Sequence, residues 1–295
     1  MFIKKMMSNE IDIENSKTVS QISFGAFGKI FLCQDHKGNN FVSKEISDKK
    51  SFIKEVKTYQ KLIKNFKYFP EFYNYYVGVK KNCIFLQCCQ RDLRYMIDSG
   101  EKINVHSFVL HTSEALDILR EKEIIHCDLK PGNILYDEFS DLFKICDFGI
   151  SCLKEDKRHY PVQTVYYRSP EVIARHAYDY SIDIWSLGCI FYEVIYGTIL
   201  FQYTKELECF YSMMVRLGMP SKRQFPEIYS NNIVYRDKKP VLTNCPNSPD
   251  MIIYREPINL TNNIFEHIIK ECIRWNPKKR ITPLNIIKIL NQSEV

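Results

Sequence analysis

The sequence predicts an α+β fold, and three patterns along the chain support that prediction. Strand-like stretches surround glycines 25 and 28, apolar residues recur every three or four positions over residues 51–64, and residues 183–195 are apolar on nearly all sides. These patterns are typical of a β-hairpin, an amphipathic helix and a buried helix, respectively. We therefore expect both strands and helices, with strands near the N-terminus.

Length, composition and charge set limits on the class of protein. The 295 residues, 45% hydrophobic and 26% charged, suffice for one two-lobed unit with little left over. No apolar run is long enough to span a membrane, and residues 1–18 form a short polar tail without the apolar core of a signal peptide. The net charge of +6 suits a ligand with acidic phosphates. We expect no membrane partner and no nucleic-acid partner.

The glycine pair lies in residues 22–30, ISFGAFGKI. Gly25 and Gly28 carry no Cβ, so a hairpin backbone could approach phosphate oxygens closely there. A G-x-x-G hairpin is more often a simple turn, but a strand-like segment follows it and ends in Lys44. Lys44 is therefore either a solvated strand lysine or a phosphate-binding group.

The periodic segment 51–64 places one acid on its apolar side. Glu55 shares a helix face with Tyr59 and Leu62. A carboxylate on such a face needs a cation, and Lys44 is the candidate, whereas the alternative is a solvated surface glutamate. We favour the Lys44–Glu55 ion pair.

Two motifs gather oxygen-bearing side chains. Residues 126–133 read HCDLKPGN, and residues 147–149 read DFG, with an apolar stretch between them. Asp128 could orient an incoming hydroxyl and accept its proton. Asn133 and Asp147 offer hard oxygens to magnesium, which bridges nucleotide phosphates.

The order H-x-D-L-K-x-x-N and then D-F-G resembles the signature of eukaryotic protein kinases. The resemblance covers about residues 19–292. It implies a protein-kinase-like two-lobed fold: a small antiparallel β-sheet lobe plus one helix at about 19–87, a linker at about 87–89, and a larger, mainly helical lobe at about 90–292. It also implies ATP and Mg²⁺ as cofactors and a protein substrate with a serine or threonine acceptor.

The resemblance assigns roles to the catalytic and metal-binding residues. Asp128 would position the substrate hydroxyl, and Lys130 would neutralise charge on the transferring phosphoryl group. Thr164 would hydrogen-bond both of them. Asn133 and Asp147 would hold the metal.

Other residues would contact the nucleotide. Lys44, paired with Glu55, would hold the α- and β-phosphates. Leu86 would stand behind the adenine as gatekeeper, and the linker backbone would hydrogen-bond the ring. The full expected set is Ile22, Gly25, Gly28, Ile30, Val42, Lys44, Glu55, Leu86, Gln87, Cys89 and Leu135. The apolar members are core residues whether or not a nucleotide is bound.

Finer features resemble the CMGC group of kinases and, within it, the dual-specificity tyrosine-regulated kinases (DYRK). The ending Y-R-S-P-E at residues 167–171 and the segment LGMP at 217–220 follow the CMGC pattern, and a polar segment at about 221–262 stands where that group carries an insert. Cys127 in the catalytic loop and the run DFGISC at 147–152 resemble the DYRK family. Glu171 is expected to pair with Arg280 as a buried ion pair.

The sequence departs from the family pattern at several positions. Ser23 replaces a loop glycine, and Gly132 replaces a glutamate that contacts basic substrates in many kinases. The tyrosine that the family autophosphorylates lies ten residues before the glutamate, and Pro161 stands there, next to Tyr160. Cys127 cannot gather a phosphate as the usual arginine does. We therefore expect activity without phosphorylation of the activation segment.

Cysteine usage and the completeness of the motifs decide the remaining expectations. Eleven irregularly spaced cysteines without a C-x-x-C pair, together with the kinase resemblance, indicate reduced thiols in the cytoplasm or nucleus and no structural zinc. We expect a monomeric, active serine/threonine kinase. A pseudokinase or nucleotide-binding scaffold is the alternative, and a small-molecule or lipid kinase is a weaker third reading.

Overall fold

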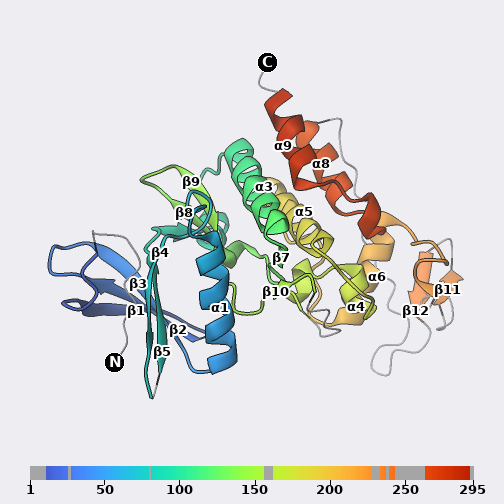
Figure 1. The fold of residues 1–295 in the computed structure, drawn as a ribbon. Coiled ribbons are helices and arrows are strands. Elements are labelled where there is room, and N and C mark those ends of the chain that lie inside the picture. Colours follow the sequence, from blue (N-terminus) through green and yellow to red (C-terminus); the bar gives the residue numbers. More distant parts are fainter. Residues whose placement is uncertain are drawn as a thin grey trace. The chain divides into compact units, whose positions relative to one another are not determined.

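The computed structural model describes residues 11–25, 28–79, 81–155, 162–226, 233–236, 239–242 and 263–292. The chain divides into two compact units, residues 1–154 with 290–295, and residues 155–289. The main β-sheet belongs to the first unit, and the second unit is mainly helical (Figure 1).

The main sheet of the first unit has five antiparallel strands in the order β1-β2-β3-β5-β4. The strands are β1 (Lys17–Gly25), β2 (Gly28–Gln34), β3 (Asn40–Ile46), β4 (Phe72–Val77) and β5 (Asn82–Gln87). Strand β3 lies between β2 and β5, and its residues Phe41, Ser43, Lys44 and Ile46 are buried. Because the neighbours Ser43 and Lys44 point to opposite faces of the sheet, both faces of this strand are covered.

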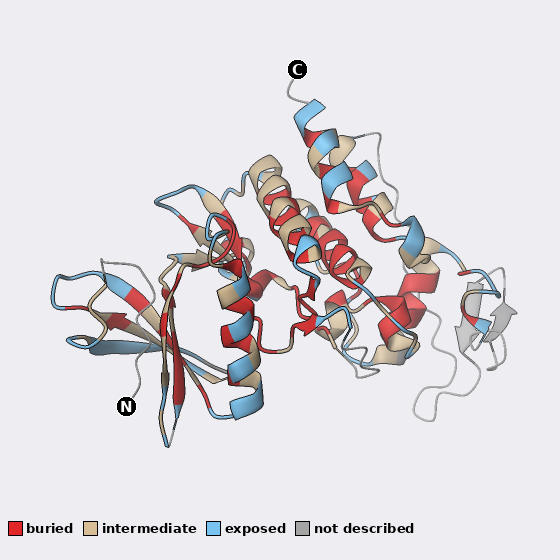
Figure 2. Cartoon of the chain, in the orientation of Figure 1, coloured by how far each residue is buried: buried red, intermediate tan, exposed pale blue. Residues whose placement is uncertain are grey.

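Helix α1 (Lys49–Leu62) packs on this sheet, against β3, β4 and β5. It begins because the Asp48 side chain caps it by accepting the amide of Ser51 at 2.7 Å. Its buried face faces the sheet and its exposed face lies on the other side (Figure 2). Tyr59 stacks on Phe72 with ring centroids 5.8 Å apart, which fixes the helix by aromatic packing.

The rest of the first unit carries short strands and two helices. They are β6 (Arg91–Asp92), α2 (Leu93–Asp98), α3 (Val105–Glu121), β7 (Ile124–Ile125), the 3₁₀ turn η1 (Pro131–Asn133), β8 (Ile134–Asp137), β9 (Leu142–Ile145) and β10 (Cys152–Leu153). Strands β6, β8 and β9 form one sheet, and β7 pairs with β10. The two motifs therefore lie beside short strand pairs: HCDLKPGN between β7 and β8, and DFG between β9 and β10.

The second unit is built around α5 (Ser181–Tyr196), which is buried over most of its length. Its other elements are η2 (Val165–Tyr167), α4 (Pro170–Ile173), α6 (Glu206–Leu217), β11 (Ile233–Arg236), β12 (Lys239–Leu242), α8 (Ile264–Cys272), η3 (Pro277–Lys279) and most of α9 (Pro283–Gln292). Gly188 lets α5 and α8 approach closely, because a Cβ there would lie 2.6 Å from Cβ of Cys272.

The expected α+β, kinase-like architecture is confirmed: an antiparallel sheet with one helix comes first, and a mainly helical part follows. The expected helix 51–64 is α1, shifted by two residues, and the all-apolar segment 183–195 is α5. The predicted linker at 87–89 lies within the first compact unit, and the predicted bounds of the two lobes stay a prediction. Most of the predicted insert, 221–262, lies outside the described residues. No helix in the described residues is long and apolar enough to cross a membrane.

Candidate active site

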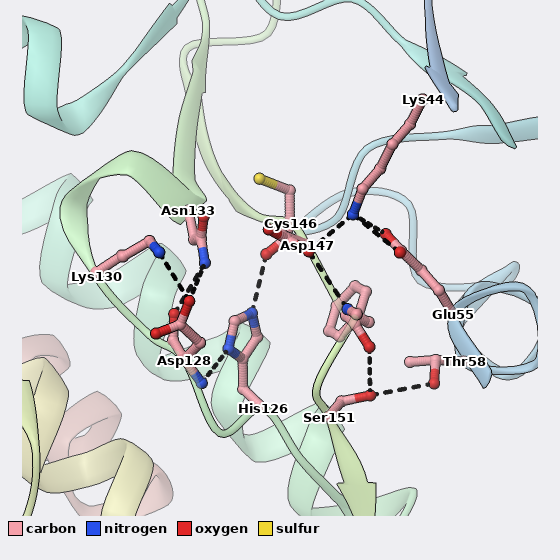
Figure 3. Close-up of polar contacts among 12 residues, drawn as sticks. Lys44, Glu55, Thr58, His126, Asp128, Lys130, Asn133, Cys146, Asp147 and Ser151 are labelled. Atoms are coloured by element: carbon pink, nitrogen blue, oxygen red, sulfur yellow. Dashed lines mark hydrogen bonds and ion pairs between the residues drawn. The ribbon is translucent and has the colours of Figure 1, made fainter. Parts of the chain in front are cut away.

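The catalytic-loop motif folds around the carboxylate of Asp128, which is buried (Figure 3). Lys130 Nζ lies 2.8 Å from Asp128 Oδ2. Asn133 Nδ2 donates to the backbone carbonyl of Asp128 at 2.9 Å and lies 3.4 Å from Oδ2. The carboxylate is thus held between a cation just before η1, Lys130, and an amide at the end of that turn, Asn133.

His126 fixes the loop from behind. Its Nδ1 accepts the backbone amide of Asp128 at 3.2 Å, and its Nε2 donates to the carbonyl of Cys146 at 2.9 Å. One ring nitrogen accepts and the other donates, so the imidazole is the neutral Nε2–H form. Because Cys146 directly precedes DFG, this ring joins the two motifs. Cys127 adopts a φ of 69°, a conformation that few residues other than glycine adopt, and the surrounding bonds hold it there.

Lys44 lies between two carboxylates. Its Nζ is 2.7 and 2.9 Å from the two oxygens of Glu55 and 2.8 Å from Asp147 Oδ1 (Figure 3). Burial works against the charge on Lys44, but the two carboxylates raise its pKa well above the usual value. Burial likewise opposes ionisation of Asp147, yet the charge and hydrogen bond of Lys44 lower the pKa of that carboxyl. Lys44 and Asp147 are therefore both charged at neutral pH, and the predicted Lys44–Glu55 ion pair is confirmed.

Aromatic packing places the Asp147 carboxylate. Phe148 is fully buried, with its ring centroid 5.1 Å from that of Tyr59 on α1 and 5.3 Å from that of His126. This ring contacts both α1 and the catalytic loop. The backbone turns at Asp147, whose φ is 66°, and the amide of Gly149 donates to Oδ1 at 3.3 Å. The buried ring and the turn together aim the carboxylate at Lys44.

The donor set fits a magnesium ion held jointly with phosphates. Asn133 uses its amide nitrogen on Asp128, which leaves the carbonyl oxygen as a hard donor. Asp147 uses Oδ1 to accept from Lys44 and Gly149, so Oδ2 is the second donor to the metal. Among the described residues no three His, Cys, Asp or Glu side chains form a metal cluster. One carboxylate plus an amide is the kind of set that suits magnesium, which keeps phosphates and waters as its other ligands.

The glycine hairpin is formed as the sequence predicts. Gly25 and Gly28 pair across β1 and β2, and residues 26 and 27 between them lie outside the described residues. Gly28 has a φ of 132°, and a Cβ there would lie 2.1 Å from the carbonyl oxygen of Glu45. Only glycine fits this position, so the hairpin could not be built with another residue.

The apolar residues expected around adenine come from neighbouring strands. Val42 on β3 pairs with Leu86 on β5, and the next strand, β2, carries Ile30. Ile22 on β1 is 54% exposed, and Leu135 lies on β8 in the smaller sheet. Their contact with a nucleotide stays a prediction.

The linker carries a polar cluster that sequence analysis missed. Lys144 on β9 is buried, and its Nζ lies 2.8 Å from Gln87 Oε1 and 3.3 Å from Asp137 Oδ2. Gln87 Nε2 in turn donates to Asp137 Oδ2 at 2.9 Å, and the backbone amide of Gln87 donates to the carbonyl of Glu71. The only sequence signal was a lysine within the apolar stretch between the two motifs. Burial raises the pKa of Cys89, two residues further on, to about 12, which favours the protonated thiol.

Thr164 lies in the second unit, at the start of η2. Its expected hydrogen bonds to Asp128 and Lys130 stay a prediction. The buried Gln163 beside it donates to the carbonyl of Ile182 at 2.9 Å and to Ser186 Oγ at 2.8 Å. Arg168 donates to the carbonyl of Gln163 at 2.6 Å and also bonds Glu206. Tyr160 and Pro161, which enter the expectation on phosphorylation, lie outside the described residues.

Comparison with known proteins agrees with this geometry. Residues 16–292 match the model of the protein kinase domain, so the chain belongs to the protein kinase family. The DYRK resemblance is confirmed by its relatives. The chain is 33% identical over 302 residues to dual specificity tyrosine-phosphorylation-regulated kinase 4 of Homo sapiens, a match that covers 92% of this chain and 56% of the relative.

Two further relatives point the same way. Dual specificity tyrosine-phosphorylation-regulated kinase 2 of Drosophila melanogaster is 30% identical, with 89% of this chain and 39% of the relative covered. Probable serine/threonine-protein kinase dyrk2 of Dictyostelium discoideum is 36% identical over 62% of this chain and 21% of the relative. The chain thus spans about half the length of these relatives or less.

Proposed function

We propose that this chain transfers the γ-phosphoryl group of Mg-ATP to serine or threonine hydroxyls of proteins. The observation that carries the proposal is the position of Lys44 between the carboxylates of Glu55 and Asp147. The Asp128 carboxylate is positioned as well, because Lys130 and Asn133 both contact this residue. Phosphoryl transfer depends mainly on positioning and electrostatics, and this arrangement supplies both.

Each group has a task in this proposal. Asp128 accepts a hydrogen bond from the substrate hydroxyl and orients it, and Lys130, already 2.8 Å away, faces the charge that develops on the phosphoryl group. Lys44 binds the α- and β-phosphates. Magnesium, when bound by Asn133 and Asp147, neutralises the phosphate oxygens. The glycine hairpin and the residues around Val42 and Leu86 would hold the rest of the nucleotide.

The hydrogen bonds of Arg168 favour substrates that carry proline directly after the acceptor residue. The Arg168 guanidinium donates hydrogen bonds to the backbone carbonyls of Val162 and Gln163, at 2.8 and 2.6 Å. A backbone carbonyl that is already bonded offers little to the amide of the residue after the acceptor. Proline has no amide proton to satisfy, so it loses nothing there. We therefore propose that proline is tolerated or preferred at this position.

The proposal includes activity without phosphorylation of the activation segment. Cys127 stands where many kinases carry the arginine that gathers a phosphate, and its thiol offers a phosphate neither a charge nor a fork of donors. A pseudokinase, the alternative, usually lacks at least one catalytic group, whereas all of them are present here. The ten cysteines of the described residues are free, which supports the proposed cytoplasmic or nuclear compartment. A monomer is part of the same proposal.

One experiment separates enzyme from scaffold. The purified chain is incubated with Mg-ATP and a degenerate peptide library that contains serine, threonine and tyrosine acceptors. We expect magnesium-dependent labelling of serine or threonine peptides. ATP binding without transfer would favour the pseudokinase, and tyrosine as the main acceptor would overturn the proposed specificity.

A further inference from the structure

The outer face of α1 is a row of lysines. Lys50, Lys54, Lys57 and Lys61 follow one another at spacings of three or four residues, so they share one side of the helix. We call these four residues the lysine stripe; it is about 16 Å long, given the rise of 1.5 Å per residue. The buried residues, Glu55 among them, occupy the opposite side (Figure 2).

Three of the four lysines, those that are exposed, have little acidic compensation. Lys50, Lys57 and Lys61 are exposed, and within the described part of the chain Lys57 and Lys61 form no ion pair. Lys50 interacts electrostatically with the helix cap Asp48. A solvated helix face usually mixes charges of both signs, because pairs of opposite charge one turn apart stabilise the helix. This face carries one sign.

The arrangement opposes helix stability when the helix is alone. Like charges one turn apart repel each other, and the first turn holds Lys49 and Lys50 but no acid, against the helix dipole. An anion on this face would reverse both effects. The lysines therefore favour a bound state of α1 over a free one.

The charge of the whole chain is concentrated in this region. Residues 48–67 hold seven lysines and two acids, whereas the rest of the chain holds 34 of the 41 basic residues and 33 of the 35 acidic ones. Nearly all of the net charge of +6 thus comes from α1 and the residues just after it. Such a local excess attracts an acidic partner and orients it before contact.

We propose that the lysine stripe binds an acidic segment of a partner protein, rich in aspartate and glutamate. The exposed residues of α1 include no arginine and no aromatic side chain, the groups that stack on bases in single-stranded nucleic acids. Beside it lies Ile53, which is 40% exposed and offers an apolar contact that a protein segment can match. Carboxylates on a partner would face the ammonium groups one helical turn apart.

Binding there has a consequence for the active site, a step that rests on the proposed function. The helix that carries the stripe also carries Glu55, the partner of Lys44. An acidic segment that removes the repulsion on the outer face stabilises α1, and with it the Lys44–Glu55 ion pair. We therefore expect the partner to increase phosphoryl transfer.

The test measures binding without ATP, so it does not depend on catalysis. Fluorescence anisotropy follows a labelled glutamate-rich peptide with one central leucine as the full chain is added. We expect binding that weakens with added salt and that falls on the order of tenfold in the Lys57→Ala/Lys61→Ala variant. Alanine suits a helix, so the variant should fold. The matched control is Lys278→Ala/Lys279→Ala, two exposed lysines of η3 with the same loss of charge.

Each outcome of this experiment either supports or contradicts the proposal. Selective loss of binding in the α1 variant supports the proposal. Absence of peptide binding, or equal binding by the wild type and both variants, overturns it. Tighter binding of single-stranded poly(U) of the same charge would also overturn it, by assigning the stripe to nucleic acid. If the peptide binds but does not raise peptide phosphorylation, the binding site stands and only the coupling to Glu55 fails.

Discussion

The ammonium of Lys44 lies 2.7 Å from the carboxylate of Glu55, eleven residues later, and both side chains are almost fully buried. A charged pair is costly to bury unless it is well bonded, and Asp147 gives Lys44 a second carboxylate partner at 2.8 Å. This contact joins β3, α1 and the DFG motif. Whatever orders α1 therefore also orders the group proposed to hold the phosphates.

The first prediction concerns the catalytic carboxylates. Asp128→Asn and Asp147→Asn should each lower kcat by on the order of a hundredfold or more, because each removes a charge aimed at the reacting groups. Steady-state kinetics with a serine peptide would measure this, with Asp98→Asn on the exposed end of α2 as the control. Turnover near the wild-type value in either active-site variant would contradict the assignment of these residues.

Part of the site could be predicted from sequence because its chemistry is local. Glu55 falls on the apolar side of a periodic helix, where a carboxylate needs a cation. Lys44 lies in the strand-like segment just before that helix, so the contact between the two residues could be predicted. The position of Gly28 follows likewise, since only glycine fits against Glu45.

The rest depends on contacts that no local pattern shows. Lys144 stands among apolar residues of β9, and its role appears only once Gln87 and Asp137 surround it. Cys127, Asp147 and Gln163 have positive φ values, which no local sequence pattern indicates for residues other than glycine.

The second prediction concerns the linker cluster. Lys144→Met removes the cation that holds Gln87 and leaves Asp137 without its charged partner. The linker backbone, which is proposed to bind adenine, would then be less fixed. We expect the KM for ATP to rise about threefold to tenfold, because a change of this size corresponds to the loss of roughly one hydrogen bond. We expect kcat to stay nearly unchanged.

The measurement is a kinetic series in ATP at saturating peptide, well below the melting temperature. Lys102→Met, which removes an exposed lysine, is the control. A fall in kcat at constant KM would show that Lys144 does not act through the linker.

The third prediction concerns the core of the second unit. Arg280 binds Glu171 through two hydrogen bonds of 2.6 and 2.7 Å, and the side chains of both are essentially inaccessible to solvent. Arg280→Met should destabilise the protein by about 3–5 kcal/mol, because it leaves a buried carboxylate without its cation. Urea denaturation would measure the loss. The double variant with Glu171→Leu should be more stable than Arg280→Met alone, and equal stability of the two would contradict this reading.

The last prediction concerns regulation. Cys127 stands where many kinases carry the arginine that gathers a phosphate of the activation segment; here the side chain is fully buried, with its Sγ 3.4 Å from that of Cys152. A buried thiol offers no charge and no fork of donors to a phosphate. Ser151 is buried too, and its hydroxyl donates to the carbonyl of Phe148 at 2.9 Å. Treatment with a broad phosphatase should therefore leave most of the kinase activity, once mass spectrometry shows residues 150–170 to be unmodified. Tyr160→Phe should behave in the same way. Loss of most activity on dephosphorylation, regained by phosphorylation at Ser151, Tyr160 or Thr164, would show instead that a phosphate completes the active site.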